Sequence, residues 1–218
     1  MRKTSLVLVF AFATSGCVSF NQQTIDTKSV ADIKGQTLTY TARKNPDFAA
    51  MTAGKAAFAL LGAIAMISEG NSIVASNNVA DPADAIAMGL SKALENAHEV
   101  RLVTPPAMVN TDDVAQVAAS VSGAARFVVD VQTVNWGFGY FPSDWTHYRV
   151  FYAAKARLIN TQTKAVVAEG FCKHIPDSSV NAPTYNELLE NGAAKLKSEL
   201  NAVAGVCVNS MKTQMLSL

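Results

Sequence analysis

Residues 126–174, RFVVDVQTVNWGFGYFPSDWTHYRVFYAAKARLINTQTKAVVAEGFCKH, decide the fold. Apolar and polar residues alternate along most of this stretch, which is the period of half-buried β-strands. Turn-forming residues interrupt the alternation at Pro142–Asp144 and again at Asn160–Lys164. We therefore predict a three-stranded antiparallel meander, with strands over Arg126–Phe138, Thr146–Asn160 and Ala165–His174.

The alternation also predicts how these three strands pair. On the buried face, Phe127 should lie opposite Leu158. On the outer face, Asp130, Lys155 and Glu169 should form a ladder of alternating charges across the three strands. The same register places Trp136 on the outer face, opposite Arg149. Because side chains alternate with a period of two, the face that each residue occupies is better determined than its partner.

The first 17 residues predict export. Arg2 and Lys3 supply a positively charged start, and residues 6–13 form an apolar run too short to span a membrane. The run ends in Thr14-Ser15-Gly16-Cys17, which resembles the lipobox of bacterial lipoproteins. The alternative is an ordinary secretory signal with an incidental cysteine.

The resemblance to the lipobox implies a lipid anchor on Cys17. In that family the cysteine is acylated, palmitate included, and becomes the N-terminus of the mature chain. Val18 follows the cysteine where Asp would retain the protein in the inner membrane. The resemblance therefore implies an outer-membrane lipoprotein that faces the periplasm.

Composition predicts one domain after the leader and no nucleic-acid partner. The sequence has 18 basic and 17 acidic residues, and loss of Arg2 and Lys3 leaves 16 basic residues against 17 acidic ones. No basic run or stripe is present, so we expect no binding to nucleic acid. The remaining chain is long enough for one core. We expect a polar tether over 18–35 and a single α+β domain over 36–218.

Cys172 and Cys207 form an even pair once Cys17 carries lipid, which favours a disulfide in an oxidising compartment. Cys172 falls on the buried face of the third strand of the meander. Cys207 belongs to one apolar stripe at helical spacing, which comprises Leu189, Ala193, Leu196, Leu200, Val203 and Cys207. Both sulfurs should point into the layer between sheet and helix, either as a bridge or as two separate buried thiols.

Residues 48–67 are apolar on every side of the helix that they predict. Only Thr52 and Lys55 are polar, which is typical of a buried or membrane helix. Glycines that permit close helix contact recur on nearly one face, at Gly54, Gly62 and Gly70. Three interpretations remain open: a helix packed on its own domain, a helix that binds a partner or a second copy, and a helix in the bilayer.

Helix and strand signals outside the meander predict a two-layer architecture. Asp81 should cap a helix that has proline at its first position, Thr111 should cap another, and Thr184 begins a capping box. Short strands are expected at Gln36–Arg43 and Val100–Thr104. The order predicts an α+β fold with helices packed on one face of a mainly antiparallel sheet, the C-terminal three-strand meander and a final helix.

No motif for catalysis or cofactor binding is present in the sequence. Gly54-Lys55 lacks the other residues of a phosphate-binding loop, and Gly137-Phe138-Gly139 lacks the third glycine and the following helix of a dinucleotide site. The three histidines, His98, His147 and His174, have no partner at metal-ligand spacing. We therefore expect neither enzymatic activity nor a bound cofactor or metal.

Aromatic residues crowd the first hairpin of the meander and its tip, at Trp136, Phe138, Tyr140, Phe141 and Trp145. In one interpretation they fold back into the core, where aromatic residues dominate. In the other they form an exposed patch that binds a partner protein or a membrane interface. The predicted register places Phe141 and Trp145 at or beyond the end of paired strand, which favours exposure of these two.

The order of these features resembles a loose group of bacterial envelope lipoproteins. The features are the lipobox at Cys17, a helix over Asp81–Glu99 that leads into the strand Val100–Thr104, and a meander that ends in Asn160-Thr161-Gln162-Thr163-Lys164-Ala165-Val166. The group includes the curli-secretion lipoprotein, lipoprotein activators of peptidoglycan synthases and the N-terminal domain of the Tol-system propeller protein. The resemblance covers residues 81–218 and implies no particular functional residue.

These expectations favour a non-enzymatic outer-membrane lipoprotein that acts as a protein-binding or assembly module in cell-envelope biogenesis. Its partners would be the membrane, through the N-terminal lipid, and either an envelope protein or a second copy of the chain. The alternative is a subunit of an oligomeric secretion or pore complex that uses the apolar helix at 48–67.

The substitution Cys17→Ser tests the lipid anchor. It removes the thiol to which the lipid is attached, so we expect an unprocessed or a released periplasmic species. Cell fractionation and metabolic labelling with palmitate measure both results. A variant that still fractionates with the outer membrane and still incorporates palmitate would show that Cys17 is not the anchor.

Overall fold

Seven strands form one mixed sheet, and helices pack on it to give the α+β, two-layer fold that the sequence predicts. The computed structural model describes residues 21–52, 54 and 59–218, so Cys17 and its lipobox lie outside the described residues. The strands lie in the order β3-β1-β5-β6-β7, with β2 beside β5 and β4 beside β1. They are β1 (Thr37–Ala42), β2 (Ala49–Met51), β3 (Arg101–Leu102), β4 (Ala107–Met108), β5 (Phe127–Phe141), β6 (Asp144–Asn160) and β7 (Ala165–His174).

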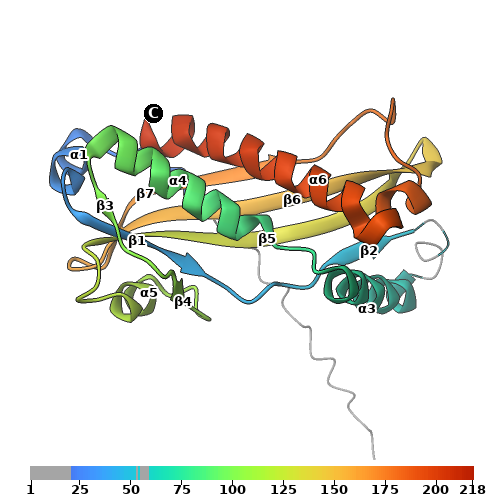
Figure 1. Cartoon of the computed structure of the whole chain (residues 1–218), viewed down its shortest axis with the longest axis horizontal. Helices are drawn as coiled ribbons and strands as arrows, with labels where there is room; N and C mark the ends of the chain where they lie inside the picture. Colours follow the sequence, from blue (N-terminus) through green and yellow to red (C-terminus); the bar gives the residue numbers. More distant parts are fainter. Residues whose placement is uncertain (1–20, 53, 55–58) are drawn as a thin grey trace, which may run out of the picture.

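Two long helices, α4 and α6, run side by side along one face of the sheet (Figure 1). Their buried residues, among them Leu90 and Leu200, belong to one core with the inward side chains of β5, β6 and β7. The described helices are α1 (Thr27–Ile33), α3 (Ala59–Asn77), α4 (Pro82–His98), α5 (Val114–Ser120), α6 (Tyr185–Met211) and the π-helix η1 (Lys212–Leu216).

The helix ends follow most of the predicted capping signals. The Asp81 side chain accepts a hydrogen bond from the backbone of Ala83 at the start of α4. Thr184 and Glu187 form the predicted capping box of α6. For α5 the prediction of Thr111 as the cap was wrong: Asp113 caps this helix and accepts from the backbone of Gln116.

The predicted meander is confirmed, but its pairing differs from the predicted one by two residues. Phe127 lies opposite Asn160 rather than Leu158, and Asp130 lies opposite Arg157 rather than Lys155. Because the shift is two residues, every side chain in this half of β5 keeps its predicted face. The charge ladder is therefore Asp130–Arg157–Glu169, with Arg157 in the place predicted for Lys155.

A β-bulge at Val134 changes which residues of β5 face the helices. Thr133 pairs with Ala154 and Asn135 pairs with Ala153, so Val134 is an extra residue without a partner on β6. Before the bulge the odd-numbered residues of β5 face α4 and α6. After the bulge the even-numbered residues face these helices, beginning with Trp136. The prediction that Trp136 lies on the outer face opposite Arg149 was wrong, because it assumed regular alternation and the bulge reverses the alternation; Trp136 pairs with Tyr152 instead.

The face of the sheet opposite α4 and α6, here called the second face, is also partly covered. In Figure 1, α5 lies below the sheet while α4 and α6 lie above it. Val117 of α5 packs with Val128 of β5 and Ile159 of β6 in a second apolar cluster. The second face is thus not the solvated outer face that the alternating charges predicted.

Beside this cluster the second face holds buried ionic groups. Asp130 is almost fully buried, and each of its carboxylate oxygens accepts from a guanidinium: Oδ1 from Arg43 at 2.9 Å and Oδ2 from Arg157 at 2.5 Å. The hydroxyl of Thr41 also donates to Oδ1, at 2.8 Å. Burial alone would raise the pKa of Asp130, but the two guanidinium groups outweigh burial and hold this pKa below its ordinary value.

The segment predicted as a tether, 18–35, is not a free tether over its described part. Gln23 exchanges two backbone hydrogen bonds with Glu169 of β7, at 2.9 and 2.8 Å, and the backbone of Ile25 donates to Met215 of η1 at 2.8 Å. Ile25 and Ile33 are buried in the main core. The folded domain therefore begins before the predicted boundary at residue 36.

The apolar stretch at 48–67 is not one helix. Ala49–Met51 form β2, and α3 begins its described course at Ala59 and ends at Asn77, beyond the predicted end. A side chain at Gly70 would collide with the backbone oxygen of Phe48, so α3 packs closely on its own domain there. Residues 53 and 55–58 lie outside the described part. None of the described helices has the length and hydrophobicity that crossing a membrane requires.

Cys172 and Cys207 form the predicted disulfide, with their Cα atoms 5.4 Å apart. Both cysteines are buried in the main core, between β7 and α6. The interpretation as two separate thiols was therefore wrong. The bridge joins the last strand to the last helix across a sequence separation of 35 residues.

Loss of this bridge should lower the free energy of unfolding. For a loop of this length the chain-entropy model gives about 4 kcal/mol. Chemical denaturation of Cys172→Ala/Cys207→Ala beside the parent protein measures the difference. Alkylation without reduction, followed by intact mass, gives an independent check: two alkylated cysteines in protein taken from the periplasm would contradict the bridge.

The substitution Asp130→Asn should be strongly destabilising because it leaves Arg43 and Arg157 buried without their counter-ion. We expect a loss of about 3–5 kcal/mol in the free energy of unfolding. Since the pKa of Asp130 is lowered in the folded state, its contribution is present above the unfolded pKa of about 3.9 and is lost as pH falls through the folded pKa. Unfolding curves at pH 7 and pH 3 measure both effects. Equal stability of parent and variant at pH 7 would contradict this account.

Candidate functional site

The structure separates the predicted aromatic patch into a buried part and an exposed part. Trp136, Phe138 and Phe141 are buried, so the prediction that they form a binding patch with Trp145 was wrong for these three residues. Trp136 and Phe138 pack against Phe48, with ring centroids 4.8 and 5.9 Å from it. Their burial follows from the bulge in β5, which turns them toward the core.

Phe141 is covered by neighbours that the sequence did not predict. It is only 2% exposed, and the guanidinium of Arg149 lies 5.3 Å from its ring centroid. Arg149 in turn donates to the backbone oxygen of Pro176, at 2.9 Å, and so brings in the loop that follows β7. A position at the end of paired strand therefore did not mean exposure, because a distant loop folds over it.

Trp145 is exposed, as predicted, with 65% of its surface open to solvent. Its indole nitrogen donates to the backbone oxygen of Pro142 at 3.1 Å, and its ring meets that of half-buried Tyr140 edge-on at 6.1 Å. These contacts hold the indole in one orientation at the turn between β5 and β6. The large apolar surface of Trp145 is thus both exposed and ordered.

Polar contacts stiffen the same turn. The Asp144 carboxylate accepts from the Thr146 hydroxyl at 2.7 Å and lies 2.6 Å from Nδ1 of His147. The bond from Thr146, followed by that from His147, lowers the pKa of Asp144 to about 2. The Asp144 carboxylate therefore stays negatively charged at neutral pH and keeps accepting these hydrogen bonds.

An apolar surface that the sequence did not reveal lies beside the turn. Val180, in the loop after β7, is 77% exposed. A cavity of about 170 Å³ separates this loop from the hairpin and is lined in part by Phe141, Val150, Pro176, Val180 and Pro183. Loop residues carry no periodicity, so no sequence signal connected them with the hairpin. We call Trp145, Val180 and the rim of this cavity the tip surface.

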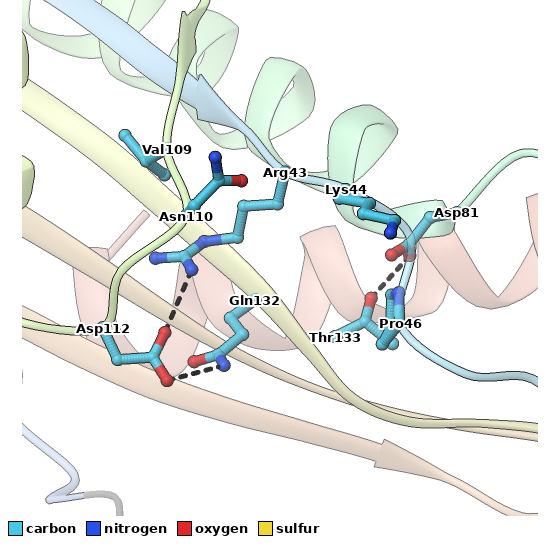
Figure 2. Close-up of a pocket in the computed structure, with 9 residues that line it drawn as sticks. All are labelled: Arg43, Lys44, Pro46, Asp81, Val109, Asn110, Asp112, Gln132 and Thr133. Atoms are coloured by element: carbon cyan, nitrogen blue, oxygen red, sulfur yellow. Dashed lines mark hydrogen bonds and ion pairs between the residues drawn. The ribbon is translucent and has the colours of Figure 1, made fainter.

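A second, polar cavity of about 300 Å³ opens on the second face. Figure 2 shows the residues that line it, which come from the segment after β1, the cap of α4, the segment after β4, and β5: Arg43, Lys44, Pro46, Asp81, Val109, Asn110, Asp112, Gln132 and Thr133. The sequence predicted none of them as a site. Their convergence depends on β1 and β5 being neighbours, which is a long-range parallel pairing.

One carboxyl group in this polar cavity is largely buried. Asp81 Oδ1 accepts from the hydroxyl of Thr133 at 2.5 Å, and that hydroxyl lies 2.8 Å from the hydroxyl of Tyr152. Burial raises the pKa of Asp81, although the bonds from Thr133 and Ala83 act against it. Burial, followed by the nearby Asp81 charge, raises the pKa of Tyr152 as well. The Asp81 carboxyl group thus caps α4 and at the same time forms one wall of the cavity.

The histidines and acidic groups are not arranged for metal binding. Within residues 21–52, 54 and 59–218, no three His, Cys, Asp or Glu side chains come together as a metal site. His147 lies in the turn, beside Asp144, whereas His98 ends α4 and His174 ends β7.

Comparisons with known proteins gave likenesses in structure only. No family model matches the chain, and no curated protein matches it. The PelC dodecamer from Paraburkholderia phytofirmans matches with a TM-score of 0.38 and 12% identity, over 90% of this chain and 96% of that one. Protein XCC0632 from Xanthomonas campestris, of family DUF330, matches with a TM-score of 0.40 and 12% identity, over 88% and 93%.

The LpoB C-terminal domain from Salmonella enterica matches with a TM-score of 0.25 and 13% identity, over 66% of this chain and 91% of that one. All three TM-scores are below 0.5, so the likenesses say nothing about what this chain binds.

Proposed function

We propose that this chain is a non-enzymatic, lipid-anchored protein-binding module of the bacterial envelope, held in the outer membrane by Cys17 and facing the periplasm. Its partner is another envelope protein, which it contacts through the tip surface. The lipobox and the disulfide framework support the compartment, since disulfides persist in oxidising compartments.

The observation that carries the proposal is the ordered exposure of Trp145. A free chain gains nothing in stability from an indole that is 65% exposed, whereas tryptophan is strongly enriched among the residues that dominate protein–protein binding. Its contacts with Pro142 and Tyr140 hold it in place, so binding would cost little side-chain entropy. Val180, which is 77% exposed, adds a second apolar side chain at the cavity that Phe141 lines.

The described N-terminal segment limits how a lipid on Cys17 would place the domain. Asn21 is bonded to Glu169 of β7, and the four Cα-to-Cα steps from Cys17 to Asn21 can span at most about 14 Å. Glu169 pairs with Arg157, and Trp145 lies twelve residues away along β6, or about 40 Å. The anchor thus holds the middle of the sheet near the membrane. The tip surface lies about 40 Å from this part of the sheet, measured along β6.

Trp145→Ala should remove binding and leave the fold intact. An exposed aromatic contributes well under 1 kcal/mol to stability, whereas a buried one contributes about 3–5 kcal/mol. We therefore expect the melting temperature to stay unchanged. We also expect that the partner protein, which crosslinks to the parent chain in intact cells, is no longer recovered with the variant. Phe141→Ala is the matched control, because this neighbouring residue is buried and its loss should lower the melting temperature.

Crosslinking in intact cells, followed by a melting curve for each purified variant, separates the two roles. Equal recovery of the partner by Trp145→Ala and by the parent chain would exclude the tip surface as the binding site. A large loss of stability in Trp145→Ala would instead assign this ring to the fold.

A further inference from the structure

The cavity in the tip surface has apolar walls and room for one side chain. Its volume is about 170 Å³, and buried Phe141, Tyr148 and Val150 line it together with Pro176 and Pro183. An apolar cavity of about 150 Å³ is large enough for benzene, so this one fits a side chain of the size of leucine. Burial of such a side chain would be favourable because it removes apolar surface from water.

A cation without an acidic partner lies at the same cavity. The guanidinium of Arg149 lies 5.3 Å from the ring centroid of Phe141, and its Nη1 donates to the backbone oxygen of Pro176 at 2.9 Å. These two contacts hold the group in place beside the cavity that all three residues line. The bond to Pro176 leaves other N–H donors of the guanidinium unused, and no carboxylate among the described residues pairs with Arg149.

The open edge of β6 adds a backbone donor. The pairing of β7 with β6 ends at His174, and Pro176, two residues further on, has no N–H for a ladder bond. The backbone N–H of Tyr148 points to this side of β6, where it donates to Pro183 at 2.8 Å. Backbone N–H direction alternates along a strand, so the N–H of Val150 points the same way. No described residue accepts from it there.

The acidic residue at the cavity is already paired. Glu199 of α6 lines the cavity, and its carboxylate lies 3.0 Å from Lys195 Nζ. Ser178 and Asn181, which also line it, carry no charge. The positive charge of Arg149 is therefore the charge that remains without a counter-ion, and it favours an anion beside the apolar walls.

An apolar side chain and an anion must fit into this small space together. The last residue of a polypeptide meets the condition, because its side chain and its carboxylate are attached to the same Cα. Arginine binds carboxylates through charge-assisted hydrogen bonds, and backbone N–H groups are a known means of holding a chain terminus.

We propose that the tip surface binds the C-terminal residue of its partner protein. The apolar side chain of that residue occupies the cavity, and Arg149 and the N–H of Val150 hold its carboxylate. The proposal rests on the proposed function, since Trp145 and Val180 would contact the residues that precede the terminus.

Peptide titrations of the purified protein in detergent micelles, followed by ¹H–¹⁵N NMR, test this site. The probes are acetyl-Gly-Gly-Leu with a free carboxylate, the same peptide as its C-terminal amide, and acetyl-Gly-Asp-Leu amide, whose carboxylate is on a side chain. We expect the free-carboxylate peptide to shift the Nε–H signal of Arg149 and the amide signal of Val150. Both amides should bind at least about tenfold more weakly, because a hydrogen bond to a charged group is lost.

A pair of variants tests the role of the guanidinium. Arg149→Gln should bind the free-carboxylate peptide and its amide equally well. Arg101→Gln is the matched control, because Arg101 is an exposed arginine of β3, and it should keep the preference of the parent protein. The comparison of peptides on the parent protein needs no variant, so it stays decisive even if Arg149→Gln disturbs the loop.

The possible failures are distinguishable. Equal binding of the free carboxylate and its amide, tighter binding of the Asp-Leu amide, or no binding of any peptide would each overturn the proposal. These results would leave the protein-binding role of Trp145 standing, because crosslinking in cells measures that role. Unchanged recovery of the partner by Trp145→Ala would instead overturn the tip surface as a whole, and this proposal with it.

Discussion

The structure depends on one constraint on the long hairpin of β5 and β6: both halves must bury their apolar face under α4 and α6. A strand of regular alternation cannot do this with the residues of β5, because Val131 and Trp136 are an odd number of positions apart and both lie in the core. The extra residue Val134 resolves the conflict by changing the face of every residue that follows it. The aromatic core around Phe48 and Tyr185 exists because of this bulge.

The second face is built on ionic rather than apolar contacts. Asp130 joins three strands, since its two guanidinium partners come from the end of β1 and from β6. Arg43 and Arg157 also bond the segment before α5, through Thr111 and Asp112. These bonds hold one side of the polar cavity, so the group that stabilises the sheet also shapes a site open to solvent. A buried ion pair is a costly way to gain stability, and its value here is that it positions the groups around it.

The tip surface and the polar cavity both use residues of the meander, but they are different kinds of site. The tip surface carries an exposed indole held by its neighbours, which suits another protein surface. The polar cavity is concave, and its ionic side chains are bonded mainly to one another and to the sheet.

The sequence by itself determined the meander, the capped helices α4 and α6 and the facing positions of Cys172 and Cys207, because each depends on local periodicity or on capping residues. The structure decided that the two cysteines form a bridge. Only the tertiary structure decided that Trp136, Phe138 and Phe141 are buried while Trp145 is exposed. That outcome depends on the bulge and on a loop more than thirty residues away, and neither leaves a periodic signal. The polar cavity could not be predicted from the sequence for the same reason. Its residues meet through the parallel pairing of β1 with β5, and no local sequence pattern indicates that pairing.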